Sequence, residues 1–177
     1  MKRILPPLLA LSLSAALAQG AQPARSTPAP QPALLATAPT VTQPSLSLAA
    51  ALRIAQLAVT NCAQGGYNVT ATVVDRAGIT LAVARSENAG PHTVDASYRK
   101  AYTSASARNA TSAIAENIRN NPASAELARI DRFLVLAGGA PVRVGGAVVG
   151  AVGVGGAPSG IIDEKCATDA VATVLGR

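Results

Sequence analysis

His92 is the residue whose type and position point most directly to chemistry, and it is the one histidine of the 177-residue chain. It stands in a loop, after Gly90 and Pro91 and immediately before a predicted helix. One histidine cannot build a zinc site, and the chain supplies no Ser-His-Asp triad. One imidazole is enough for an axial bond to haem iron, because the porphyrin supplies four other donors. The alternative, a polar residue on a surface loop, stays open.

Cationic and phenolic side chains surround this histidine in the sequence. Arg85, Arg99 and Lys100 carry charges that can pair with haem propionates. Tyr98 and Tyr102 lie four positions apart and therefore share one face of the predicted helix. They fit a helix core or a pocket wall, and a tyrosine can also bind haem iron.

Cys62 and Cys166 are the two cysteines, and neither belongs to a CxxC or CxxCH motif. That pattern excludes covalent c-type haem attachment and thioredoxin chemistry. The pair forms a disulfide or remains as two buried thiols, and the sequence leaves both states open. If their helices share one side of a sheet, a bridge would close a loop of roughly 100 residues, worth up to about 4.7 kcal/mol.

The remaining motifs carry no specific chemistry. The glycines between residues 150 and 160 do not form a dinucleotide fingerprint, because Pro158 interrupts them and no acidic residue follows at the required distance. Glycines in a strand instead let another backbone or a flat ligand approach closely. Asp163 and Glu164 are predicted to cap a helix and complement its dipole. No carboxylate pair has a spacing that specifies acid–base catalysis.

Composition narrows the class of protein. Hydrophobic residues make up 49% of the chain and charged residues 14%, which is typical of a folded globular domain. Three tyrosines, one phenylalanine and no tryptophan argue against a binder that stacks nucleic-acid bases. The net charge of +6 falls to +4 without Lys2 and Arg3, and the excess is scattered, so no nucleic-acid partner is expected.

The N-terminal region is predicted to be an export signal followed by a linker. Residues 1–18 combine a basic start with a short apolar run that ends in Ala-Leu-Ala, as in a secretory signal peptide. An uncleaved anchor is the alternative, and no membrane span is expected after cleavage. Residues 19–44 hold six of the twelve prolines and are predicted to be a disordered linker. Residues 45–177 then form one folded domain in the periplasm or outside the cell.

Periodicity predicts an α+β fold for that domain. Apolar residues recur at helical spacing from Leu48 to Cys62, after Ser45 and Ser47 as N-cap candidates. Residues 68–73 and 79–83 alternate around a glycine turn, which predicts a β-hairpin. Thr93 is expected to cap the next helix. The further predicted elements are two helical pieces, three strands and a last helix, at 111–118, 124–130, 133–136, 140–144, 147–154 and 163–175. Together they indicate an antiparallel sheet flanked by helices.

Several stretches in order resemble the GlcG/HbpS-like family of haem-degrading or haem-binding domains. They are Val73–Gly78, Arg85, His92–Thr103, Gly138–Val142, Gly146–Val154 and Asp163–Ala167. The resemblance covers about residues 45–177. It implies a profilin-like fold, assembly into homo-oligomers, and binding of haem or a related tetrapyrrole.

The resemblance also assigns roles to individual residues. Within the ligand-facing stretch from His92 to Thr103, it makes His92 the iron ligand. The other implied cofactor contacts are Thr93, Tyr102, the propionate partners Arg85, Arg99 and Lys100, and a close-approach wall at Gly155 and Gly156. Many relatives carry serine where Gly155 stands, so a hydroxyl contact there is lost.

The leading hypothesis is therefore an exported haem-binding protein, with weak haem degradation or redox or haem sensing as a further role and an envelope sensor protein as a partner. Two alternatives remain. One is a cofactor-free structural or signalling oligomer that docks an envelope partner through its N-terminal linker. The other is an accessory protein for a corrinoid or a small hydroxy acid. The sequence does not decide whether the protein is an enzyme.

Overall fold

The computed structural model describes residues 35–176. The chain divides into two units, Met1–Val41 and Thr42–Arg177, and the fold described below is that of the second unit. The predicted signal peptide and the linker up to residue 34 lie outside the described residues, and residues 35–44 contain no helix or strand. No helix in the described range is long and apolar enough to cross a membrane.

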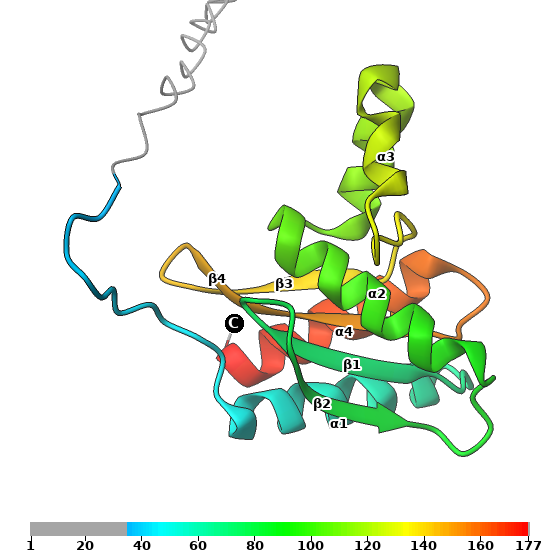
Figure 1. Cartoon of the computed structure of the whole chain (residues 1–177). Helices are drawn as coiled ribbons and strands as arrows, with labels where there is room; N and C mark the ends of the chain where they lie inside the picture. The colour runs from blue at the N-terminus through cyan, green and yellow to red at the C-terminus, as the bar shows by residue number, and fades with distance from the viewer. Residues whose placement is uncertain (1–34, 177) are drawn as a thin grey trace, which may run out of the picture. The chain divides into compact units, whose positions relative to one another are not determined.

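The folded unit contains helices and strands in an α-β-β-α-α-β-β-α order, with one 3-10 helix after α3 (Figure 1). Their bounds are α1 Leu48–Gln64, β1 Thr70–Asp75, β2 Thr80–Arg85, α2 His92–Ala107, α3 Thr111–Asn120, η1 Pro122–Arg129, β3 Gly139–Val144, β4 Ala147–Gly155 and α4 Gly160–Leu175.

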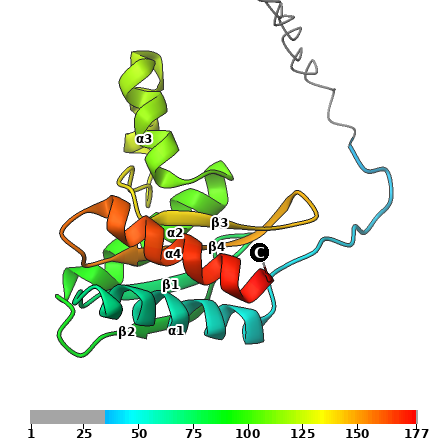
Figure 2. The ribbon, with the colours of Figure 1, turned by 180° about the vertical axis from the view of Figure 1, so that it is seen from behind.

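The four strands form one antiparallel sheet in the order β2-β1-β4-β3. Helices α1 and α4 cover one face of it and α2 covers the other (Figures 1 and 2). Because side chains alternate along a strand, Ala71 and Val73 of β1 join the apolar core on the α1–α4 side, whereas Thr70 and Thr72 face α2. This arrangement confirms the predicted α+β fold.

Helix α2 lies directly on the sheet because the sheet offers it small and hydroxyl-bearing residues. A Cβ atom at Gly153 would lie 2.1 Å from the carbonyl oxygen of Ser97, so only glycine permits this approach. The hydroxyl oxygens of Thr72 and Ser97 are 2.8 Å apart, and those of Thr70 and Thr93 are 2.6 Å apart. These buried polar groups satisfy one another, which makes their burial tolerable.

Two predicted elements differ from the structure. Residues 133–136 form no strand, because the Arg99 side chain donates to the carbonyl of Phe133 at 2.7 Å and Thr103 Oγ1 accepts from the N–H of Leu134 at 2.8 Å. Backbone groups that would enter a ladder are therefore bonded to α2. The predicted helix at 124–130 is instead the 3-10 helix η1.

A disulfide joins Cys62 of α1 to Cys166 of α4, with 5.5 Å between their Cα atoms. It is one of the two states that the sequence left open. The two helices pack side by side on the same face of the sheet (Figure 2), which brings together cysteines 104 residues apart. The bridge thus ties the first helix of the fold to the last.

Replacing both cysteines, Cys62→Ala with Cys166→Ala, should preserve the fold but lower its free energy of unfolding by about 2–5 kcal/mol, because the unfolded chain regains the freedom of a long loop. Urea denaturation followed by circular dichroism measures the loss. Wild-type protein treated with dithiothreitol is the matched control and should lose a similar amount. Equal stability of the double variant and the oxidised wild type would contradict the expectation.

Candidate functional site

An open groove of about 450 Å³ lies between α2 and the edge strand β2. It exists because α2 packs mainly on β4 and β1 and leaves the outer part of β2 uncovered. Val83 and Val94 form opposite walls and are 51% and 45% exposed. The other lining residues are Thr72, Thr80, Pro91, Asp95 and Tyr98. Apolar walls with a few polar groups are typical of small-molecule sites.

His92 stands at the start of α2, between groove residues Pro91 and Val94, and its side chain is exposed. Its imidazole folds over Gly90: a Cβ atom built there would lie 2.9 Å from Nδ1 and 2.8 Å from Cε1, but 3.9 Å from Nε2. Nδ1 therefore faces the loop, and Nε2 is the nitrogen directed away from it.

Thr93 is buried beneath this turn instead of capping it. Its hydroxyl lies 2.6 Å from the carbonyl oxygen of Gly90 and 2.6 Å from the hydroxyl of Thr70. Helix α2 already begins at His92, after Pro91. Proline is well suited to a helix start because its fixed φ matches the helix. Thr93 thus anchors the first turn of α2 to β1.

Arg85 ends β2 and is exposed, in register with Thr70 of β1. Its guanidinium donates a hydrogen bond to the carbonyl of Ala89, in the loop that leads to His92. Of the three predicted propionate partners, Arg85 is the one that the structure brings to the His92 loop.

Arg99 and Tyr102 lie further along α2, outside the groove. The Arg99 guanidinium donates to Phe133 at 2.7 Å and lies 3.8 Å from Asp95. The Tyr102 ring packs on the turn at Gly78, where a Cβ atom would lie 2.7 Å from it, and meets Phe133 edge-on. Both side chains hold the segment after η1 against α2.

The two glycines predicted as a close-approach wall also lie outside the groove. Gly155 is buried under α2, where an added Cβ would make an ordinary contact of 3.5 Å with Ala96. Gly156 has φ +136°, and a Cβ there would lie 2.5 Å from the carbonyl oxygen of Asn68. Gly155 therefore lies where α2 packs on β4, and Gly156 lies in a tight turn. Neither glycine forms a wall of the groove.

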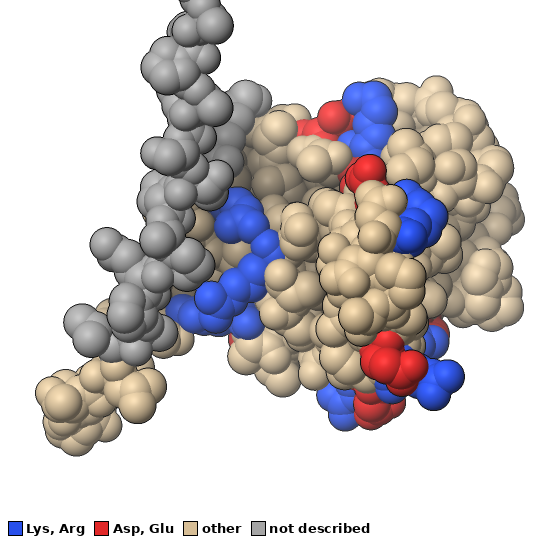
Figure 3. Space-filling view, turned by 90° about the horizontal axis from the view of Figure 1, so that it is seen from above, with Lys and Arg blue, Asp and Glu red and all other residues tan. Residues whose placement is uncertain are grey.

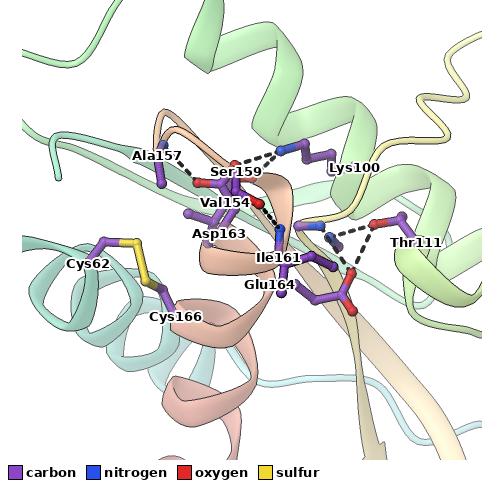
Figure 4. A network of polar contacts seen from close by, with 12 residues as sticks. Cys62, Lys100, Thr111, Val154, Ala157, Ser159, Ile161, Asp163, Glu164 and Cys166 are labelled. Carbon is purple, nitrogen blue, oxygen red and sulfur yellow. Dashed lines mark hydrogen bonds and ion pairs between the residues drawn. A yellow bond between two sulfur atoms is a disulfide. The ribbon is translucent and has the colours of Figure 1, made fainter. Parts of the chain in front are cut away.

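Lys100 is buried, although it was predicted to pair with a propionate. Figure 4 shows its contacts. Its ammonium donates to the carbonyl of Val154 at 2.9 Å and to Asp163 Oδ2 at 2.8 Å. Lys100 and Asp163 side chains are 2% and 3% exposed. A propionate cannot reach this ammonium, so Lys100 belongs to the framework and not to a ligand contact.

Asp163 is a buried partner of Lys100 and not simply a helix cap. Its Oδ1 also accepts from the N–H of Ala157 at 3.0 Å. Burial raises the pKa of Asp163 above its ordinary value, and the Lys100 hydrogen bond and charge, with the N–H groups of Ala157 and Gly156, lower this pKa by less. The capping role falls to Ser159, whose side chain accepts from the N–H of Ile161 at 3.3 Å.

Glu164, the next residue, fastens two other segments to α4 (Figure 4). Its carboxylate accepts from the N–H groups of Ser112 and Gly138, each at 3.1 Å, and from the Ser112 hydroxyl. Ser112 lies in the first turn of α3, where a carboxylate is favoured by the helix dipole. Glu164 thus interacts with the N-terminal turn of α3, whereas Asp163 is the acidic residue in the first turn of α4, as predicted.

The groove combines Val83 of β2, which reasoning from the sequence assigned to no site, with Val94 and Tyr98, which lie in the ligand-facing stretch that the resemblance implied. Val94 and Tyr98 are four positions apart on α2, and Val83 alternates with buried Ala82 on β2. The periodicity that marked them as apolar faces was therefore the available signal. Within residues 35–176, no group of three or more His, Cys, Asp or Glu side chains is placed to hold a metal ion.

An antiparallel sheet with one helix on one face, two on the other, and an open groove at its edge strand defines a class of small α+β domains. The family model described as "Haem degrading protein HbpS-like" matches residues 46–172. The chain belongs to this HbpS-like family.

Known relatives agree with that assignment. A double mutant of Streptomyces reticuli HbpS has a similar crystal structure, with a TM-score of 0.73 at 40% identity over 85% of this chain and 100% of that one. An uncharacterized 15.0 kDa protein of the dhaT-dhaS intergenic region of Citrobacter freundii is 33% identical over 63% of this chain and 80% of its own length. The PduOC:heme complex shares the fold, with a TM-score of 0.64 at 22% identity over 72% of this chain and 94% of that one.

Lys100→Met should lower the free energy of unfolding by about 3–5 kcal/mol, because it leaves the Asp163 carboxyl buried without its partner. The double variant Lys100→Met with Asp163→Leu should lose less than the single variant. Lys165→Met, which removes an exposed ion pair with Asp169, is the matched control and should cost about 0–1 kcal/mol. Urea denaturation measures all three, and a Lys100→Met cost no larger than that of Lys165→Met would refute the framework role.

Gly90→Ala should displace the His92 imidazole without unfolding the protein, since the new methyl would overlap the ring while the backbone conformation suits alanine. In the wild type, NMR should show a nuclear Overhauser contact between the His92 ring and the Gly90 α-protons. The equivalent contact should change in the variant, and Asn88→Ala in the same loop should preserve it. An unmoved ring in Gly90→Ala would contradict this geometry.

Proposed function

We propose that this protein binds haem or a related tetrapyrrole in the groove between α2 and β2, with His92 as the iron ligand. The observation that carries the proposal is an exposed imidazole that directly follows Pro91, a lining residue of an open groove with valine walls. Membership of a family described as haem-degrading, and a neighbour of the same fold that was crystallised as a haem complex, support it.

The residues around the groove fit such a ligand by type. Val83 and Val94 offer apolar contact to a flat macrocycle, and Tyr98 adds an aromatic wall. Arg85, at the end of β2, supplies a cation for a propionate carboxylate. His92 presents Nε2 away from its own loop, as an axial ligand requires.

When bound, the cofactor would supply redox chemistry at its iron. The chain's own residues would orient the ring, with apolar contact from the valine walls. We propose weak haem degradation, or redox or haem sensing, as the consequence, and export to the periplasm or the medium as the setting. An envelope sensor protein is then a fitting partner.

Replacing His92 with alanine tests the iron ligand. Wild-type protein titrated with hemin should develop a sharp Soret band, and His92→Ala should bind at least about tenfold more weakly, a loss of about 1.4 kcal/mol, with a shifted band. Free imidazole added to the variant should restore the wild-type spectrum. An unchanged titration and spectrum in His92→Ala would refute the assignment.

A second variant tests whether hemin binds in the groove between α2 and β2. Val94→Glu puts a charge into the groove, and it should weaken hemin binding because a charged carboxylate replaces an apolar contact with the macrocycle. Leu52→Glu, on α1, is the matched control: Leu52 is 54% exposed and Val94 45%. Equal losses in both variants would point to nonspecific surface adsorption of hemin.

A further inference from the structure

Two strand-connecting turns, the end of α2 and the start of α1 lie together at one end of the sheet. Asp75, the last residue of β1, pairs with Gly150 of β4, and Arg143 of β3 pairs with Val148 of the same strand. The β1–β2 turn and the β3–β4 turn are therefore neighbours, at the left in Figure 1. We call this region the hairpin end, and it consists of residues 75–79 and 143–148 with Arg108 and Leu48.

Hydrogen bonds bring α2 and α1 to the hairpin end. The Arg143 guanidinium donates to the carbonyl of Arg108, the residue that follows α2. The N–H of Leu46, two residues before α1 begins, donates to the carbonyl of Val149 at 2.9 Å. The hairpin end is thus built from four segments that are far apart in the sequence, so arginines that are scattered along the chain come together only in the fold.

The charged side chains of the hairpin end are mostly basic. They are the three arginines Arg76, Arg108 and Arg143 and the one carboxylate Asp75, which gives a net charge of 3 − 1 = +2. Asp75 Oδ1 accepts from the N–H groups of Ala77 and Ile79, at 2.8 and 2.9 Å, and so holds its own turn. Seen from above, basic side chains gather at the left edge of the molecule with little acidic surface beside them (Figure 3). Such a concentration of one sign of charge attracts anions.

Exposed aliphatic side chains accompany these arginines. Ile79 is 65% exposed at the end of the β1–β2 turn, Val144 is 49% exposed at the β3–β4 turn, and Leu48 is 56% exposed at the start of α1. A Cβ atom built at Gly145 or Gly146 lies in open space, and the β3–β4 hairpin projects beyond its neighbours (Figures 1 and 2). The two turns therefore present apolar side chains and positive charge to the same partner.

The combination indicates the chemistry of that partner. A small hydrated anion would use the arginines and leave the aliphatic side chains in water. A surface of anionic phospholipid offers phosphates to guanidinium groups and, directly beneath them, an apolar layer to aliphatic side chains. Basic residues near such a surface are each attracted to it, and this attraction adds to the burial of apolar area.

We propose that the hairpin end docks the protein on the surface of a membrane that contains anionic phospholipid. The arginines pair with lipid phosphates, and Val144 and Ile79 enter the boundary between headgroups and acyl chains. His92 is the first residue of α2 and Arg108 follows its last, so docking leaves His92 at the opposite end of that helix. The proposal does not rest on haem binding.

Tryptophan fluorescence tests the contact directly, because the chain contains no tryptophan. Val144→Trp should shift its emission to shorter wavelength with vesicles made of equal parts phosphatidylcholine and phosphatidylglycerol, but not with phosphatidylcholine alone. Ile161→Trp is the matched control, at a residue that is 61% exposed in the first turn of α4. This turn lies beside Ala137, before β3 begins and therefore away from the hairpin end, so its tryptophan should show no shift. Ile79→Trp is a second reporter that should behave as Val144→Trp does.

The fluorescence readout is local, so contact of another part of the chain with the vesicles does not imitate it. Absence of a shift in both Val144→Trp and Ile79→Trp would overturn the proposal. Equal shifts in these variants and in Ile161→Trp would also overturn it, because they would show adsorption without a preferred face.

Charge variants test the arginines. Arg76→Gln with Arg108→Gln, in protein that carries Val144→Trp, should lower the affinity for the anionic vesicles at least about tenfold, because two basic side chains leave the lipid surface. Arg119→Gln with Arg129→Gln, on α3 and η1, removes the same net charge elsewhere and should change the affinity by no more than about twofold. Equal losses in the two double variants would attribute binding to net charge and would contradict docking through the hairpin end.

Salt competition separates a lipid surface from a soluble phosphate ligand. About 1 M sodium chloride should release most of the protein carrying Val144→Trp from the anionic vesicles, since the charges are then screened. Sodium phosphate at the same ionic strength should release it to the same extent as sodium chloride. Release by phosphate at concentrations where chloride has no effect would indicate a site for the free anion and would overturn the assignment to a membrane.

Discussion

The position of α2 depends on one buried ion pair. Lys100, near the middle of that helix, places its ammonium against both the Val154 carbonyl near the end of β4 and the Asp163 carboxylate. Because Asp163 belongs to α4, the pair joins the helix on one face of the sheet to a helix on the other. A charge pair taken out of water is tolerated only when its geometry and additional hydrogen bonds compensate for lost hydration, so the pair allows little freedom in where α2 lies. The groove beside β2 depends on that placement.

The first turns of α4 are where the separate parts of the domain meet. Asp163 holds α2, Glu164 holds α3 and the segment at Gly138, and Cys166 holds α1 through the disulfide. Three residues within one short stretch thus anchor three other helices. A fold with few aromatic residues, in which most buried apolar side chains are small, gains specificity from such polar and covalent contacts.

The fold was predictable from the sequence to a large extent, and the candidate site much less. Alternation around Gly78 and helical periodicity from Leu48 onward predicted the first hairpin and α1, because these signals are local. His92 and Arg85 were predicted near one another, and the structure brings both to the loop beside the groove. Lys100 was assigned to the same surface as His92 because the two are close in sequence. Its partner lies 63 residues away, and no local pattern announces such a pairing.

By itself, the sequence determined where helices and turns form and which strands alternate, since each depends on neighbouring side chains and on backbone conformations that glycine or proline allow. Tertiary structure alone decided which carboxylate neutralises Lys100, that Cys62 meets Cys166, that Phe133 and Leu134 bond to α2 instead of to a strand, and that the outer part of β2 stays open. The physical reason is common to these four cases. Each is a contact, or an uncovered surface, between segments far apart in the chain, and it is set by how α1, α2 and α4 pack on a shared sheet.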